Sequence, residues 1–179
     1  AQLDWHRRHQ FCSVCGQRTE PGRGGQVRKC MACKADHFPR TDPVAIMVVT
    51  DGERCLLGQS RGRLSRTGTY SALAGFMDQG ESIEEAVRRE IWEESGVECG
   101  AVRYVTSQPW PFGGSQLMIA CVADADGDQL TIDYTELEDA MWVTKDEARA
   151  ALADAPDKLF GAPPPFAIAH SLLRHWAEM

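Results

Sequence analysis

The sequence lacks an excess of basic residues, a long apolar run and a recognisable signal peptide. Its 179 residues include 19 Lys and Arg against 26 Asp and Glu, which gives a net charge of −7 at pH 7. Because non-specific nucleic-acid binding needs basic surfaces, this balance argues against a general phosphate-binding surface. No apolar run approaches the roughly 20 residues of a membrane-spanning helix. We therefore expect a cytoplasmic protein with no membrane partner.

Four of the seven cysteines form two short motifs, Cys12-x-x-Cys15 and Cys30-x-x-Cys33, separated by 14 residues. Two such motifs on tight turns place four thiolates at the corners of a tetrahedron, which is typical of a structural zinc site. Two disulfides or two redox dithiols are the alternatives. Disulfides are rare in cytosolic proteins, and a redox pair needs no duplicate. We therefore predict structural Zn²⁺, with His37 as a surface histidine rather than a ligand.

Residues 82–96 have the pattern of an amphipathic helix. Ser82 and Glu85 form a plausible capping box at its start, and Gly96 is a natural stop. At about 100° per residue, Glu90 and Glu94 project from the middle of the apolar face. The alternative is a solvated helix whose glutamates face water. A buried carboxylate is costly without a positive partner, and oxygen-only clusters suit Mg²⁺ or Mn²⁺, so a metal site is our interpretation.

The remaining segments mix strands and helices without regular alternation, so we predict an α+β fold or a three-layer α/β/α fold. A small zinc-ribbon module over residues 1–40 should precede a second domain over residues 41–179. Strands are expected at residues 44–50, 54–60, 70–75, 101–106, 116–125, 129–133 and 140–144, and further helices at residues 146–155 and from 166 to near 179. Residues 62–68 are expected to form a loop.

Residues 75–97 resemble the Nudix box of the Nudix hydrolase superfamily at every position that the box specifies. The matching order is Gly75, five residues, Glu81, seven residues, Arg89-Glu90-Ile91, one residue, Glu93-Glu94, one residue, Gly96-Val97. The resemblance implies a mixed sheet between helices. It also implies metal-assisted cleavage of a nucleoside diphosphate linked to another group.

Residues 107–115, SQPWPFGGS, closely resemble the SQPWPFPxS signature of the NADH pyrophosphatase (NAD-capped RNA hydrolase) family. The simpler alternative is a surface turn with Trp110 packed on the core. The four-cysteine module, the LAGF segment and the PPPFAIAH segment also resemble that family, so the likeness covers residues 1–179. Members carry a further domain before the zinc module, and we expect this chain to lack it. Gly113-Gly114 departs from the signature and should make the loop more flexible.

The resemblance implies roles for individual residues. The catalytic metal would be held by the Ala74 carbonyl and by Glu90, Glu93, Glu94 and Glu136, with Glu93 as a further ligand or proton acceptor. The substrate would be bound by Phe38, Phe76, Gln108, Pro109, Trp110, Pro111, Phe112, Ser115 and Ala169. Phe76 would stack on a base, together with Phe38 of a second subunit, because the family is dimeric.

The implied activity is hydrolysis of the pyrophosphate bond of NAD(H) to NMN(H) and AMP, with Mg²⁺ or Mn²⁺. NAD caps at RNA 5′ ends contain the same bond. Two alternatives stay open. One is a broader Nudix hydrolase that acts on ADP-ribose or dinucleoside polyphosphates. The other is a zinc-ribbon binding module attached to an inactive Nudix scaffold.

Overall fold

The computed structural model describes residues 1–62, 65–112 and 114–179, and it divides the chain into two compact units. The first unit contains residues 1–42 and 109–117, and the second contains residues 43–108 and 118–179. In the described parts of the chain, no helix has the length and apolarity that crossing a membrane requires.

The first unit is a small antiparallel sheet with a short helix. The sheet has the order β1 (Thr19–Gly22), β2 (Val27–Cys30), β3 (Asp36–His37). Helix α1 (Gln2–Arg8), which the sequence reasoning did not predict, buries Trp5. Arg28 on β2 is buried and donates from Nε to Thr19 Oγ1 at 2.8 Å and from Nη2 to the Thr19 carbonyl at 2.7 Å. So small a unit buries little apolar surface, which makes a metal a plausible source of stability.

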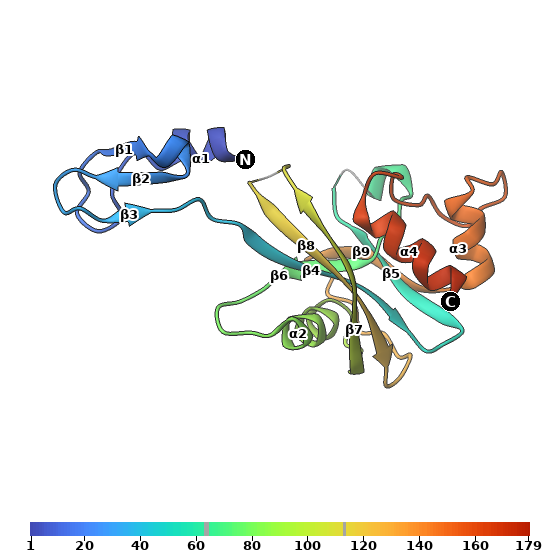
Figure 1. The fold of residues 1–179 in the computed structure, drawn as a ribbon. Helices are drawn as coiled ribbons and strands as arrows, with labels where there is room; N and C mark the ends of the chain where they lie inside the picture. The colour runs from blue at the N-terminus through green and yellow to red at the C-terminus, as the bar shows by residue number, and fades with distance from the viewer. Residues whose placement is uncertain (63–64, 113) are drawn as a thin grey trace. The chain divides into compact units, whose positions relative to one another are not determined.

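The second unit is built on a six-stranded sheet (Figure 1). Its strand order is β7-β8-β4-β5-β9, and β6 pairs with β4 beside this path. The strands are β4 (Asp42–Thr50), β5 (Arg54–Ser60), β6 (Leu73–Phe76), β7 (Cys99–Trp110), β8 (Gln116–Ala125) and β9 (Leu137–Thr144), and the helices are α2 (Ile83–Ser95), α3 (Lys145–Leu152) and α4 (Ile168–Glu178). The predicted α+β class and the three-layer arrangement are confirmed.

Strand β4 shows why the sheet lies between helices. Ile46 and Val48 belong to a core cluster shared with α3 and α4, whereas Met47 and Val49 belong to a second cluster shared with α2. Successive side chains of a strand point to opposite faces, so both faces of β4 are covered. This double burial explains its continuous apolar run. Figure 1 shows α2 on one side of the sheet and α3 and α4 on the other.

The strand predicted at residues 129–133 is wrong. The segment instead hydrogen-bonds to the end of α2: Thr131 N donates to the Ser95 carbonyl at 2.8 Å and Asp133 N to the Glu94 carbonyl at 3.0 Å. Its backbone groups therefore satisfy carbonyls at a helix terminus, where intrahelical donors run out. The predicted loop at residues 62–68 contains a short 3₁₀ turn at Ser65–Thr67, and residues 63 and 64 lie outside the described residues.

Candidate metal and substrate site

Helix α2 begins and ends as its sequence predicts. Ser82 Oγ accepts from Glu85 N at 3.2 Å, and Glu85 Oε2 accepts from Ser82 N at 2.8 Å, which completes the capping box. Gly96 closes the helix in the left-handed conformation at φ 72°. These two ends fix the register of the helix, so the positions of its glutamates follow directly.

Glu90 and Glu94 are buried, with 8% and 6% of their surface exposed. Glu94 Oε2 is the only buried side-chain nitrogen or oxygen without a hydrogen-bond partner among the residues that the structure describes. Burial, and then the charges of Glu90 and Glu136, raise the pKa of Glu94 to about 8. Burial also raises the pKa of Glu90, although Arg89 opposes this shift. Ionising these two buried carboxyl groups therefore carries an energetic cost.

Gly75 on β6 makes room for Glu90. A Cβ added at Gly75 would lie 1.9 Å from Glu90 Cδ and Oε2, closer than any real contact allows. Gly75 pairs with Ala45, and Ala74 pairs with Ile46, so β4 holds this backbone in place. The absence of a side chain lets the carboxylate lie directly against the strand. Ala74, predicted to offer its carbonyl, adjoins this contact in the chain.

Arg89 ties the helix to the segment before it. Its Nε donates to Glu81 Oε1 at 2.6 Å, and its Nη2 donates to Glu81 Oε2 and to the Phe76 carbonyl, both at 2.9 Å. Its Nη1 donates to Glu90 Oε1 at 2.7 Å and to Glu93 Oε2 at 2.9 Å. All five guanidinium donors are used. Arg89 therefore fixes both the backbone of Phe76 and the carboxylate of Glu90.

Glu93 and Glu136 are exposed, and both act electrostatically on the buried pair: each raises the pKa of Glu90 and of Glu94. The structure thus brings four predicted ligands into one acidic region, three from α2 and one from the turn before β9. Within residues 1–62, 65–112 and 114–179, the only group of three or more His, Cys, Asp or Glu residues whose ligand atoms all lie within 4.8 Å of one another is the cysteine group described next. The four glutamates do not form such a compact group, and like charges oppose a closer approach.

The four predicted zinc ligands Cys12, Cys15, Cys30 and Cys33 form one cluster in the first unit. Their sulfur atoms all lie within 4.8 Å of one another. The backbone N–H of Cys33 is the largest influence on the Cys30 thiol, whose pKa is lowered to about 6. His37 Nε2 lies 3.3 Å from Cys12 Sγ. Its interpretation as an ordinary surface histidine was therefore incomplete: it contacts a proposed ligand without joining the cluster.

Among the predicted substrate residues, Gln108 has a well-defined role in the second unit. Its Nε2 donates to the Phe166 carbonyl at 2.9 Å, and its Oε1 accepts from Ile168 N at 2.8 Å. Both ends of the amide therefore hold the backbone at the start of α4, where Ala169 is buried. Phe76, at the end of β6, is 54% exposed and leaves its ring face available.

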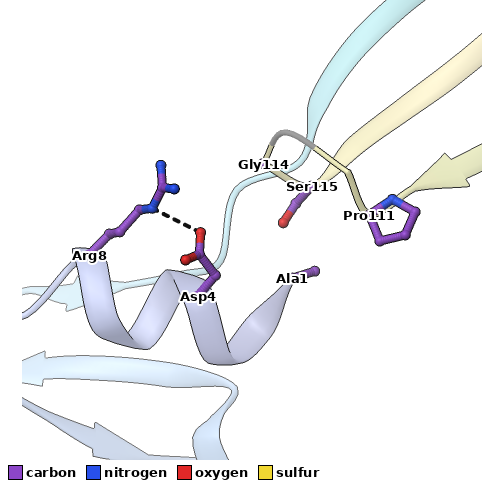
Figure 2. A pocket seen from close by; sticks show the side chains of 6 residues that line it. All are labelled: Ala1, Asp4, Arg8, Pro111, Gly114 and Ser115. Carbon is purple, nitrogen blue, oxygen red and sulfur yellow. Dashed lines mark ion pairs between the residues drawn. The ribbon is translucent and has the colours of Figure 1, made fainter.

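The other predicted substrate residues lie in the first unit. The rings of Trp110 and Phe112 meet edge to face with centroids 5.1 Å apart, and Phe38 is 61% exposed. This unit contains a cavity of about 240 Å³. Figure 2 shows the residues that line it, among which Arg8 pairs with Asp4: Ala1, Asp4, Arg8, Pro111, Gly114 and Ser115. Pro109 is the first residue of the stretch 109–117 that belongs to this unit. Gly113, where the sequence departs from the family signature, lies outside the described residues.

Comparison with known proteins gives the family of this chain. The model of the NUDIX domain matches residues 39–161. This chain belongs to the Nudix family. The model of the NADH pyrophosphatase zinc ribbon domain matches residues 7–38, which contain the cysteine cluster. The predicted family membership is therefore confirmed at the level of both models.

Curated relatives are similar to the chain across the regions that the two family models match. This Nudix chain is 45% identical over 99% of its length to "NAD-capped RNA hydrolase NUDT12" of Macaca fascicularis, covering 40% of that protein. It is 43% identical over 99% of its length to "NAD(P)H pyrophosphatase NUDT13, mitochondrial" of Homo sapiens, covering 53% of it. "NAD-capped RNA hydrolase NudC" of Erwinia tasmaniensis is 40% identical over 80% of the chain and 54% of the relative. The chain thus spans about half the length, or less, of these relatives.

A solved structure supports the fold. The NUDIX hydrolase from Nitrosomonas europaea superposes with a TM-score of 0.71 over 94% of this chain and 90% of that one, at 19% identity.

Sequence reasoning about this Nudix chain missed two contributors to the site. The packing of Gly75 against Glu90 depends on a strand and a helix meeting, and the bonds of Asp133 to α2 depend on a segment predicted as a strand.

Proposed function

We propose that this chain hydrolyses the pyrophosphate bond of NAD(H), giving NMN(H) and AMP, and removes NAD caps from RNA 5′ ends by cleaving the same bond. The observation that carries the proposal is the buried Glu94 carboxylate, whose Oε2 has no partner within the described protein. The names of the similar proteins, NAD-capped RNA hydrolase and NAD(P)H pyrophosphatase, support the choice of substrate.

The residues present fit a divalent cation. Glu94 offers an unpartnered oxygen, and the glycine at position 75 lets Glu90 approach the strand. The donor set is all oxygen, as Mg²⁺ and Mn²⁺ prefer. We propose Glu90, Glu93, Glu94, Glu136 and the Ala74 carbonyl as the residues that would hold it. The chemistry that such a cation supplies is neutralisation of the pyrophosphate charge and activation of water.

The protein's own groups would then orient the substrate and the carboxylates. Arg89 favours the ionised form of Glu90 and holds its carboxylate in place, because its Nη1 donates to that carboxylate at 2.7 Å. Glu93 is exposed and could accept a proton at its carboxylate. The exposed ring of Phe76 would stack on a base. Gln108 would act on the substrate through the start of α4, since its own amide is already paired.

Three further properties are proposed. Structural Zn²⁺ would be held by the four cysteines, in a zinc-ribbon module over residues 1–40 that precedes the hydrolase domain over residues 41–179. A homodimer would cover exposed aromatic rings such as Phe38 and Phe76. We also propose a cytoplasmic location. Sedimentation equilibrium and cell fractionation with the full-length protein test the last two.

Product analysis tests the function. The zinc-loaded protein is incubated with Mg²⁺ or Mn²⁺ and with NADH, NAD, ADP-ribose, a dinucleoside polyphosphate or an NAD-capped RNA in separate reactions, and the products are separated by chromatography. We expect reduced nicotinamide mononucleotide and AMP from NADH, and a 5′-monophosphate RNA from the capped RNA. Efficient cleavage of ADP-ribose or dinucleoside polyphosphates with little cleavage of NADH would favour the broader hydrolase. Cleavage of none of them would favour an inactive scaffold.

A further inference from the structure

The turn that precedes β9 is attached to the helix that carries the buried glutamates. Thr131 N donates to the Ser95 carbonyl at 2.8 Å, and Asp133 N donates to the Glu94 carbonyl at 3.0 Å. A Cβ at Gly96 would lie 2.8 Å from Thr131 Cβ, so the glycine at the helix end allows this close approach. The backbone of residue 133 is therefore bonded to the backbone of Glu94 itself.

Asp133 then organises the residues that follow. Its Oδ1 accepts from Thr135 N at 2.8 Å, which closes an Asx turn. Its carbonyl accepts from Glu136 N at 3.1 Å and from Leu137 N at 3.0 Å. Arg61 holds the other side of the turn, because its Nη1 donates to the Tyr134 carbonyl at 2.5 Å. Every hydrogen bond in this series involves a backbone group. The backbone position of Glu136 is therefore fixed relative to the backbone of Glu94.

We propose that Asp133 is a positioning residue for the divalent-cation site: its Asx turn holds Glu136 at a fixed place relative to Glu94, so that both carboxylates reach one cation. The inference rests on the proposed metal site. When the protein fixes the spacing of two ligands from separate elements beforehand, less entropy is lost as the ion binds. Groups that orient ligands in this way typically contribute about 10- to 100-fold to metal affinity.

Asp133 could also act simply through its negative charge, and two variants separate the possibilities. Asp133→Asn keeps an oxygen at the same place to accept from Thr135 N, but it removes the charge. Asp133→Glu keeps the charge, but its longer side chain does not close the two-residue turn. Asp51→Ala is a matched control, because Asp51 Oδ1 closes a similar turn onto Glu53 N at 3.0 Å and Arg54 N at 2.7 Å in the β4–β5 hairpin.

The test is Mn²⁺ binding to zinc-loaded protein without substrate, with free Mn²⁺ counted by electron paramagnetic resonance. We expect Asp133→Glu to weaken Mn²⁺ binding about tenfold or more. Asp133→Asn and Asp51→Ala should stay within about twofold of the parent. Equal weakening by Asp133→Asn and Asp133→Glu would show that an oxygen able to close the turn is not enough to support the site. Unchanged binding in Asp133→Glu would show that the turn does not position Glu136. Either result overturns the proposal.

Failure of the metal site itself gives a different result. If the parent binds no Mn²⁺, or if Glu94→Gln binds it as tightly as the parent, then the proposed function fails and Asp133 has no cation to serve. If the parent binds Mn²⁺ and Glu94→Gln does not, the metal site stands, and the Asp133 variants alone decide the inference. Thermal unfolding of each variant without Mn²⁺ confirms that binding is compared between folded proteins.

Discussion

Replacing Glu94 by Gln should stabilise the metal-free protein, although most substitutions of buried residues destabilise. Burial and the neighbouring carboxylates raise the pKa of Glu94 from 4.5 to about 8. At pH 7 the folded protein must keep on Glu94 a proton that the unfolded chain has released. Each pH unit above the ordinary pKa costs about 1.4 kcal/mol, so this cost at pH 7 is at most about 3 kcal/mol. Gln has nearly the same shape and carries no such cost.

The sign of the pH dependence follows from the direction of the shift. A carboxyl group whose pKa is higher in the folded state does not affect the free energy of unfolding below about pH 4.5, where it is protonated in both states. Between about pH 4.5 and pH 8 it lowers the free energy of unfolding by a growing amount. The stability advantage of Glu94→Gln should therefore shrink from about 3 kcal/mol at pH 7 to about 1 kcal/mol at pH 5.5. Taking the difference between variant and parent cancels the titration of other groups.

Urea unfolding of both proteins at pH 7 and pH 5.5 measures this difference. The buffers should be free of Mg²⁺ and Mn²⁺ but should contain no strong chelator, which would remove zinc. Glu84→Gln is the control, because Glu84 is exposed on the same helix, and it should change stability by less than about 0.5 kcal/mol. Added Mn²⁺ should stabilise the parent but not Glu94→Gln. A variant that is less stable than the parent in metal-free buffer, or an advantage independent of pH, would refute the reasoning.

Three further substitutions test other parts of the site. Gly75→Ala should displace Glu90, because the new Cβ would lie 1.9 Å from its Cδ. We expect the affinity for Mn²⁺, measured by titration, to fall at least about tenfold. Unchanged affinity would show that the close approach of Glu90 to the strand is unnecessary. Cys30→Ser should release about one zinc ion per chain by metal analysis and unfold the first unit; full stability without zinc would contradict this. Gln108→Met should raise KM for NADH severalfold while kcat changes little, since both bonds to the start of α4 are lost; a fall in kcat alone would argue against this role.

The sequence predicted helix α2 well because its determinants are local. The capping box and the terminal glycine set the ends of α2, and a period of 3.6 residues then placed Glu90 and Glu94 on its buried face. The apolar run at residues 44–50 likewise indicated a strand, and the structure shows that both faces of β4 are covered. The paired cysteine motifs predicted the sulfur cluster because their spacing alone indicates it.

Features that depend on tertiary contacts could not be predicted in this way. Residues 129–133 alternate like a strand, but their donors are taken by the carbonyls at the end of α2. The family motif indicated a substrate role for Gln108, but it carried no information that its amide bonds the chain about 60 residues further on. The contact of His37 with Cys12 likewise joins residues that are distant in sequence. Periodicity carries no information about such pairings.

NADH cleavage by the parent and by Glu94→Gln, each folded and zinc-loaded, tests the central claim most directly. Both proteins are given NADH with saturating Mn²⁺, and the rate of appearance of AMP and reduced nicotinamide mononucleotide is measured by chromatography. We expect the parent to form both products in equal amounts, and Glu94→Gln to be slower by a factor on the order of 10³ or more, because it loses the buried carboxylate proposed to hold the cation. Equal rates in the two proteins, or no cleavage of NADH by the parent, would contradict the assignment.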